Sequence, residues 1–220
     1  MPRKRGPRTS VKSKAWTPLT RERLVEAALE LIDEHGLEAF STRKLGAALG
    51  VEAMSIYNHF PSKGDLLDAI ASRLLAEVEL PERGEFGSRL STLLHSHQAV
   101  ARRHPDAYPL LALRRLNTPE AFRFLEYLFA LFAGLGFDPP MQTRLFRLVG
   151  HWATGAALSE LSVRSRVPHS TPSVPAEQMD PSRYPLTTKA TPYLMEEHFD
   201  DSFEFGLEQM IAVIEGLPRS

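Results

Sequence analysis

Apolar side chains recur along most of this chain at intervals of three and four residues, the spacing that aligns them on one face of an α-helix. The pattern predicts helices over about residues 17–34, 42–49, 53–59, 63–79, 86–103, 106–116, 119–135, 141–161 and 199–217. The helix over 119–135 is apolar on nearly every side, which predicts burial all round. No segment shows the strict alternation that is typical of a strand. The sequence therefore predicts an all-α protein.

The second and third of these helices are short and meet at a tight turn. Ser41 is a residue type that caps helix N-termini, and Gly50 can end the first helix because glycine enters left-handed backbone cheaply. Proline disfavours helical geometry in the preceding residue, so Phe60-Pro61 ends the second helix. Gly46 lies where the helices approach most closely, and only a small side chain fits there. This spacing predicts a helix-turn-helix motif.

The second helix of this motif leaves a short outward face with no acidic residue after Glu52. Such a face suits the DNA major groove, where side chains meet phosphates and base edges. The residues expected to contact DNA from this helix are Ala53, Met54, Ser55, Tyr57, Asn58 and His59. Thr42, Arg43 and Lys63 flank it and are expected to bind the phosphate backbone. The alternative is a helical hairpin packed inside an all-α domain.

The motif and its flanks resemble a known family. An amphipathic segment from Leu19 to Ile32 leads through Gly36 into Ser-Thr-Arg-Lys-Leu at 41–45, Leu-Gly-Val at 49–51, Ser-Ile-Tyr-Asn-His-Phe at 55–60, Lys63 and Leu-Leu-Asp-Ala-Ile at 66–70. Over residues 18–79 this pattern strongly resembles the DNA-binding domain of the tetracycline-repressor (TetR) family of bacterial transcription regulators. Two later segments, 148–155 and 203–208, resemble the two dimer-forming helices of the tetracycline-repressor type.

The resemblance implies an N-terminal three-helix helix-turn-helix DNA-binding domain and a C-terminal helical domain for ligand binding and dimerisation. It implies a repressor that binds a palindromic operator in double-stranded DNA as a homodimer and is released by a small organic effector. A two-fold dimer is also the geometry that places two recognition helices in successive grooves. No cofactor is expected.

Changes in composition divide the chain into segments. Residues 1–16 form a basic polar arm that we expect to be disordered when free. Residues 17–80 form the expected DNA-binding domain, and the turn-rich segment 81–87 follows it. Residues 81–220 form the expected effector-binding and dimerisation domain, in which the proline-rich stretch 163–192 reads as a mobile connection with at most one helical turn.

Charge is distributed unevenly along the chain. Its net charge is −1, which alone argues against a nucleic-acid binder. The first 14 residues, however, contain six Lys or Arg residues and no acidic residue, so a basic arm precedes a mildly acidic body. This asymmetry is typical of a DNA-binding protein with an added arm, although the arm could also be a passive tail.

Two absences limit the location of the protein. There is no cysteine, which excludes disulfides and thiolate metal sites and fits a reducing cytoplasm. The longest strongly apolar run, Tyr127–Phe137, has 11 residues, well short of the ~20 that span a bilayer. We therefore expect a cytoplasmic protein without a membrane partner.

The two long helices near the C-terminus carry more apolar surface than one domain core needs. Two apolar faces are explained if each helix packs on its own core and also on a partner subunit, so that four helices form a bundle. The residues expected at this dimer interface are Leu145, Leu148, Phe203, Leu207, Met210, Ile211 and Ile214.

Polar residues set among aromatic ones between residues 86 and 161 indicate where an effector would bind. The expected contacts are His95, His97, Tyr108, Phe122, Phe129, His151 and Trp152, although each alone fits an ordinary core or surface position equally well. Histidines two apart point to different sides of a helix, so no metal site is expected at His95 and His97.

By alignment with the tetracycline repressor, its magnesium-ligating histidine falls near Ala112 and its drug-contacting histidine falls at Glu79. Neither histidine is present, which makes a magnesium–tetracycline chelate a poor candidate. The aromatic composition favours an apolar or amphipathic organic effector instead.

Two other classes compete with the ligand-responsive regulator. An enzyme would need a metal triad, phosphate loop or nucleophile elbow, and no such motif occurs, so we expect that the chain is not an enzyme. An architectural DNA-binding protein without an effector would bind DNA identically but would keep its C-terminal core filled.

Overall fold

The computed structural model describes residues 18–114, 117–164, 180–194 and 198–219, and all regular elements within these residues are helical. In chain order they are α1 (Arg21–His35), α2 (Thr42–Leu49), α3 (Ala53–Tyr57), α4 (Lys63–Ala76), α5 (Phe86–Arg103), α6 (Tyr108–Leu113), α7 (Pro119–Gly134), α8 (Pro139–Arg164), α9 (Pro185–Ala190), a 3-10 turn (Thr191–Tyr193) and α10 (Phe199–Gly216). The all-α prediction is confirmed. The basic arm predicted over residues 1–16 lies outside the described residues.

Capping chemistry explains several helix boundaries. The Thr20 side chain accepts the Arg23 backbone N–H, so α1 begins at Arg21 rather than at residue 17. The fourth helix ends at Ala76, three residues before the predicted end. Part of the predicted connection over 163–192 is helical as α9, and residues 165–179 lie outside the described part of the chain.

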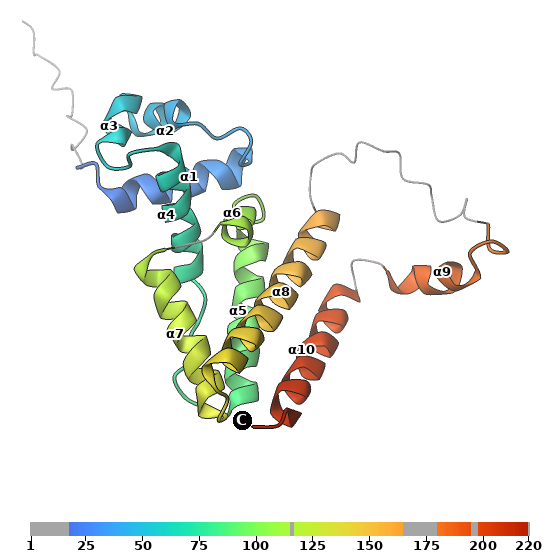
Figure 1. Cartoon of the computed structure of the whole chain (residues 1–220). Helices are drawn as coiled ribbons and strands as arrows, with labels where there is room; N and C mark the ends of the chain where they lie inside the picture. The colour runs from blue at the N-terminus through green and yellow to red at the C-terminus, as the bar shows by residue number, and fades with distance from the viewer. Residues whose placement is uncertain (1–17, 115–116, 165–179, 195–197, 220) are drawn as a thin grey trace, which may run out of the picture.

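The first four helices form an N-terminal bundle at one end of the molecule (Figure 1). Leu24 and Ile32 of α1, Leu45 of α2, Ile56 of α3 and Ile70 of α4 are fully or almost fully buried in its core. Helix α4 then extends toward the second domain, where α6 and α7 pack against it. It therefore belongs to both domains.

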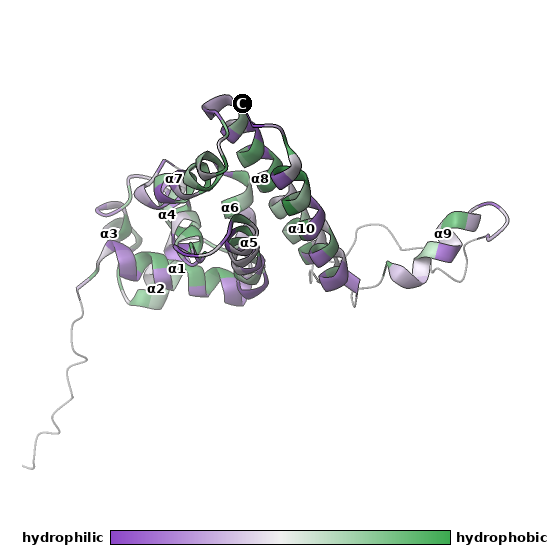
Figure 2. Ribbon diagram, turned by 90° about the horizontal axis from the view of Figure 1, so that it is seen from below, coloured by the Kyte–Doolittle hydropathy of each residue, from purple (hydrophilic) through white to green (hydrophobic). Residues whose placement is uncertain are grey.

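The second domain is built around α5, α7, α8 and α10. Helices α8 and α10 lie side by side in both views and form one flank of the molecule (Figures 1 and 2). Figure 2 shows hydrophobic and hydrophilic residues alternating around α10, as in an amphipathic helix. Helix α9 stands apart from the packed helices and buries no residue. Among the described residues, no helix is long and apolar enough to cross a membrane.

The predicted burial of the helix over 119–135 on all sides is wrong for this subunit. Helix α7 packs on α4 and α8 with Ala121, Leu128, Leu131 and Phe132, whereas Phe122 is 56% exposed. The side of α7 that carries Phe122 therefore faces solvent. The spacing of apolar residues did not distinguish this side from the buried one.

The predicted dimer residues lie mainly inside the subunit. Leu145 and four of the five predicted α10 residues (Phe203, Leu207, Met210 and Ile214) are buried in the subunit's own core, and Ile211 is partly buried. Gly206 allows this packing, because an added Cβ would lie 2.8 Å from the Trp152 ring. The apolar residues that remain exposed on this flank are Leu148, Phe205 and Val213.

Candidate functional site

The helix-turn-helix motif is set by close packing at its turn. The Ser41 hydroxyl accepts the Lys44 N–H at 3.2 Å, which caps α2, and Gly50 ends α2 in the left-handed region with φ of 69°. A Cβ on Gly46 would lie 2.8 Å from the carbonyl oxygen of Val51. The prediction that only a very small residue fits at Gly46 is therefore confirmed, and this contact fixes how α3 crosses α2.

The predicted DNA-contacting residues of α3 lie on its outer side. Met54 is 70% exposed, and Tyr57 and Asn58 are also exposed, whereas Ile56 points into the core. Ala53, Ser55 and His59 are partly exposed. The helix therefore presents a mixed face at the tip of the N-terminal bundle (Figure 1).

The flanking residues gather around the start of α2. The Tyr57 hydroxyl lies 3.4 Å from the Thr42 hydroxyl, and the Lys63 ammonium donates to the carbonyl oxygen of Phe40 at 3.0 Å. Arg43 is exposed next to them. The N-terminus of α2 thus lies beside two basic side chains, an arrangement that suits a phosphate.

One positioning residue of this motif was missed by the sequence analysis. Arg21 donates to the carbonyl oxygen of His59, and its guanidinium lies 4.1 Å from the centre of the Phe60 ring. The residue ties the end of α3 to the start of α1. Residues 21 and 59 are far apart in sequence, so no local spacing could have revealed the contact.

A cavity of about 420 Å³ lies in the second domain, between α4, α5, α6, α7 and α8. Its lining is mainly apolar, and its polar members are His97, Tyr108, Arg114 and Thr154. The apolar residues include Leu75, Leu93, Leu111, Ala112, Phe124, Leu128, Phe146, Val149, Gly150 and Ala153. A mainly apolar cavity with a few polar groups is typical of a site for a small organic molecule.

Of the seven predicted effector contacts, His97 and Tyr108 line this cavity and the other five do not. Phe122 and His151 are exposed, and Phe129 packs edge-on against Phe146. Trp152 packs on Phe203, and His95 binds Glu204 of α10 at 2.6 Å. Burial lowers the pKa of His95, whereas the hydrogen bond to Glu204 raises it, and the net result is a raised pKa.

The buried polar pair of the cavity is uncharged. The His97 Nε2 atom lies 3.4 Å from the Tyr108 hydroxyl, and the two rings meet edge to face with centres 5.5 Å apart. Burial lowers the pKa of His97 to about 4, and burial also raises the pKa of Tyr108. At neutral pH the pair therefore offers a neutral imidazole and a neutral phenol.

The buried imidazole predicts a specific loss of stability in acid. An unfolded histidine binds a proton below its ordinary pKa of 6.5, whereas native His97 stays neutral down to about 4. The unfolded state therefore gains protons first, and His97 should lower the free energy of unfolding by about 2 kcal/mol between pH 7 and pH 5. Urea unfolding at both pH values measures this.

The matched variants are His97→Gln and His151→Gln. Because His151 is exposed, His151→Gln should show the same fall in the free energy of unfolding between pH 7 and pH 5 as the parent protein. In His97→Gln this fall should be smaller by about 2 kcal/mol. Equal pH dependence in the two variants would contradict a neutral, buried His97.

Helix α6 connects the cavity wall to the N-terminal bundle. Tyr108, Leu111 and Ala112 face the cavity, while the helix packs against α4. Arg114, directly after α6, lines the cavity and donates to Asp68 and, at 3.1 Å, to the carbonyl oxygen of Gly64. Both acceptors belong to α4.

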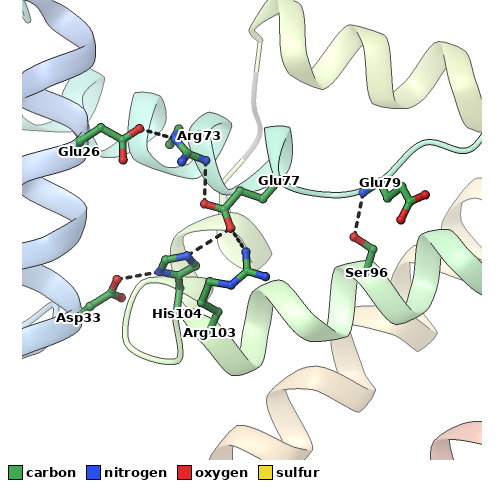
Figure 3. Close-up of polar contacts among 8 residues, drawn as sticks. All are labelled: Glu26, Asp33, Arg73, Glu77, Glu79, Ser96, Arg103 and His104. Atoms are coloured by element: carbon green, nitrogen blue, oxygen red, sulfur yellow. Dashed lines mark hydrogen bonds and ion pairs between the residues drawn. The ribbon is translucent and has the colours of Figure 1, made fainter.

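A second connection between the domains is a network of charges at the end of α5 (Figure 3). Glu77 accepts from Arg73 at 2.7 Å and from Arg103 at 2.5 Å, and His104 bridges Glu77 and Asp33 of α1. Burial works against the charge on Glu77, but these partners lower its pKa overall. The network joins α1 and α4 to α5 and so limits how the domains can tilt.

Comparison with family models supports both halves of this description. A model described as bacterial regulatory proteins of the tetR family matches residues 24–70. A second, described as the tetracyclin repressor-like C-terminal domain, matches residues 80–217. The two matches cover the helix-turn-helix bundle and the domain that holds the cavity.

The chain is also similar to individual transcription regulators, both in sequence and in structure. The chain is 34% identical to the HTH-type transcriptional repressor DrrR1 of Streptomyces coeruleorubidus over 146 residues, which cover 65% of this chain and only 54% of DrrR1. It is 28% identical to the class D tetracycline repressor of Escherichia coli, with 88% of each protein covered. The solved structure of ActR from Streptomyces coelicolor in complex with actinorhodin superposes with a TM-score of 0.77 at 25% identity, covering 91% of this chain and all of ActR.

Proposed function

The chain belongs to the TetR family of bacterial regulatory proteins, and within that family we propose that it is a homodimeric repressor that leaves its operator when an organic effector fills the cavity. The observation that carries the proposal is the double role of α4. Its residues Leu66 and Ile70 lie in the core of the helix-turn-helix bundle, and Leu75 lies in the cavity wall.

Coupling between cavity and DNA follows from this arrangement. A molecule that pushes α6 outward also displaces α4, since the two helices pack together and Arg114 binds α4 directly. Displacing α4 moves the recognition helix α3. If the effector binds the displaced position of α4 more tightly than the original position, effector binding weakens DNA binding. The coupling free energy between two such sites is typically about 1–3 kcal/mol.

The dimer places two recognition helices on one DNA face. We propose that the exposed residues Leu148, Phe205 and Val213 on the flank formed by α8 and α10 contact the same flank of a second subunit. Two operator half-sites one turn of DNA apart, about 34 Å, would then each bind one α3 helix. A small tilt of α4 changes the separation of the two α3 helices, so that they no longer fit both major grooves at once. The recognition residues remain those predicted from sequence.

The competing classes receive less support. An architectural DNA-binding protein would keep its C-terminal core filled, whereas this domain contains a cavity of about 420 Å³ with a mainly apolar lining. The relatives named above are transcription regulators, which disfavours an enzyme. ActR was solved with actinorhodin bound, and a structurally similar chain with an organic ligand favours an effector site here.

The proposal is tested by selecting an operator from random DNA and screening aromatic natural products for release of the protein from it. Gly150 lines the cavity, and a Cβ placed on it meets no atom within 4 Å. Gly150→Leu should therefore fill part of the cavity and raise the concentration needed for release at least tenfold, with unchanged affinity for the operator.

The control is Gly134→Leu at the exposed end of α7, where a Cβ also meets no atom within 4 Å. This variant should respond like the parent protein. Release of Gly150→Leu at the parental concentration, or a screen in which no compound releases the parent protein, would contradict an effector in this cavity.

A further inference from the structure

The charges around the cavity restrict the ligand. Among the described residues that line it there is no aspartate or glutamate, and Arg114 is the charged member of the lining. A cationic ligand would therefore lie beside the Arg114 guanidinium, and no carboxylate in the lining would pair with the ligand's charge. This is an electrostatic disadvantage in a partly buried site. The lining admits neutral and anionic molecules.

Arg114 has hydrogen-bonding capacity left for a ligand. Its Nε donates to Asp68 and its Nη2 donates to the carbonyl oxygen of Gly64. A guanidinium has five N–H donors, and within the described part of the chain the two on Nη1 meet no hydrogen-bond acceptor. These N–H groups can donate to an anionic oxygen such as that of a carboxylate.

The other end of α6 brings a different chemistry to the cavity. Tyr108 is the first residue of α6 and Arg114 follows its last residue, so the helical rise separates their backbones by about 9 Å. At the Tyr108 end the neutral His97 and the Thr154 hydroxyl complete an uncharged polar group. Phe124 and Phe146 supply aromatic surface to the cavity wall.

We propose that the effector is an aromatic acid, with a hydroxyl or carbonyl group bound by His97 and Tyr108 and a carboxylate bound by Arg114. The inference rests on the proposed function, because it identifies the ligand of the same cavity. It also gives the carboxylate a role in release: a second anion bound to the same guanidinium weakens its ion pair with Asp68, a contact that holds α4.

Matched probes test the ligand class without DNA present. Three pairs of a hydroxylated aromatic acid and its methyl analogue cover increasing ring sizes: salicylic acid and o-cresol, hydroxynaphthoic acid and methylnaphthol, rhein and chrysophanol. Titration calorimetry or fluorescence quenching gives each dissociation constant. At least one acid should bind at least tenfold more tightly than its methyl partner. Equal affinities within every pair, or no binding of any acid, would overturn the proposal.

Variants test the assignment to Arg114. Arg114→Gln should reduce the preference for the acid to less than threefold, whereas Arg123→Gln on an exposed part of α7 should preserve it. Asp68→Asn removes the competing carboxylate and leaves the cavity lining intact, so it should strengthen binding of the acid severalfold and leave binding of the methyl analogue unchanged. A preserved preference in Arg114→Gln, or no gain in Asp68→Asn, would overturn the assignment.

Failure of the inference and failure of the proposed function give different results. A protein that binds the acid through Arg114 but is not released from DNA keeps the ligand assignment and loses the regulatory function. A protein that is released by compounds without an acidic group keeps the regulatory function and loses the ligand assignment.

Discussion

Replacing Gly46 with leucine is expected to reduce operator affinity at least a thousandfold, to about the level of non-specific binding. The Cβ alone would lie 2.8 Å from the Val51 carbonyl oxygen and 3.2 Å from the Ala53 backbone nitrogen. Both are backbone atoms, which cannot rotate away as a flexible side chain can. The rest of a leucine side chain must therefore force α3 away from α2 and change the angle at which it enters the groove.

Two measurements separate this effect from loss of the fold. The Gly46→Leu subunit should keep its helical circular dichroism and its affinity for the aromatic acid probes, because the cavity lies in the second domain. Gly134→Leu adds the same side chain at an open helical site and should bind operator normally. Operator binding by Gly46→Leu within tenfold of the parent protein would show that the crossing of α2 and α3 does not control recognition.

The helix-turn-helix motif was predictable because its determinants are local. The Ser41 cap, Gly46 at the crossing and Gly50 in left-handed backbone lie within ten residues. Ser41 and Gly50 follow from the preferences of their residue types, and Gly46 follows from its missing side chain. Arg21 was missed for the opposite reason. Its partners at residues 59 and 60 come close only after α1 and α3 have packed in the same bundle.

The predicted effector contacts and the cavity lie in the same domain, but only His97 and Tyr108 of those contacts line the cavity. Its walls come from five helices, and their relative rotation decides which residue faces inward. Phe122 and Phe124 show the problem, since two phenylalanines of the same helix face solvent and cavity respectively. Gly150 carried no apolar signal, yet its missing side chain helps to leave the space open.

The dimer residues illustrate a related limit. A helix at a subunit interface has two apolar faces, and periodicity does not reveal which face packs on its own domain. On α10 the more regular stripe, containing Leu207 and Ile214, packs inside the subunit, whereas Phe205 and Val213 remain exposed beside it.

The two faces of α10 therefore predict opposite outcomes for equivalent substitutions. In Leu207→Glu/Ile214→Glu, two carboxylates enter positions that are 2% and 0% exposed within one subunit. Each buried, unpaired charge costs several kcal/mol, which together approach the typical total stability of about 5–15 kcal/mol. The double variant should be unfolded or aggregated. Circular dichroism and urea unfolding measure this directly.

Phe205→Glu/Val213→Glu places the same two charges at positions that are 66% and 55% exposed in the single subunit. The subunit should keep its fold, because water still solvates both carboxylates, but a partner flank could no longer cover them without a similar desolvation penalty. Sedimentation should show a monomer, and operator affinity should fall at least a hundredfold because one recognition helix binds alone. A folded dimer in this variant would mean that subunits associate through another surface, and a folded monomer in Leu207→Glu/Ile214→Glu would mean that those two side chains face the partner after all.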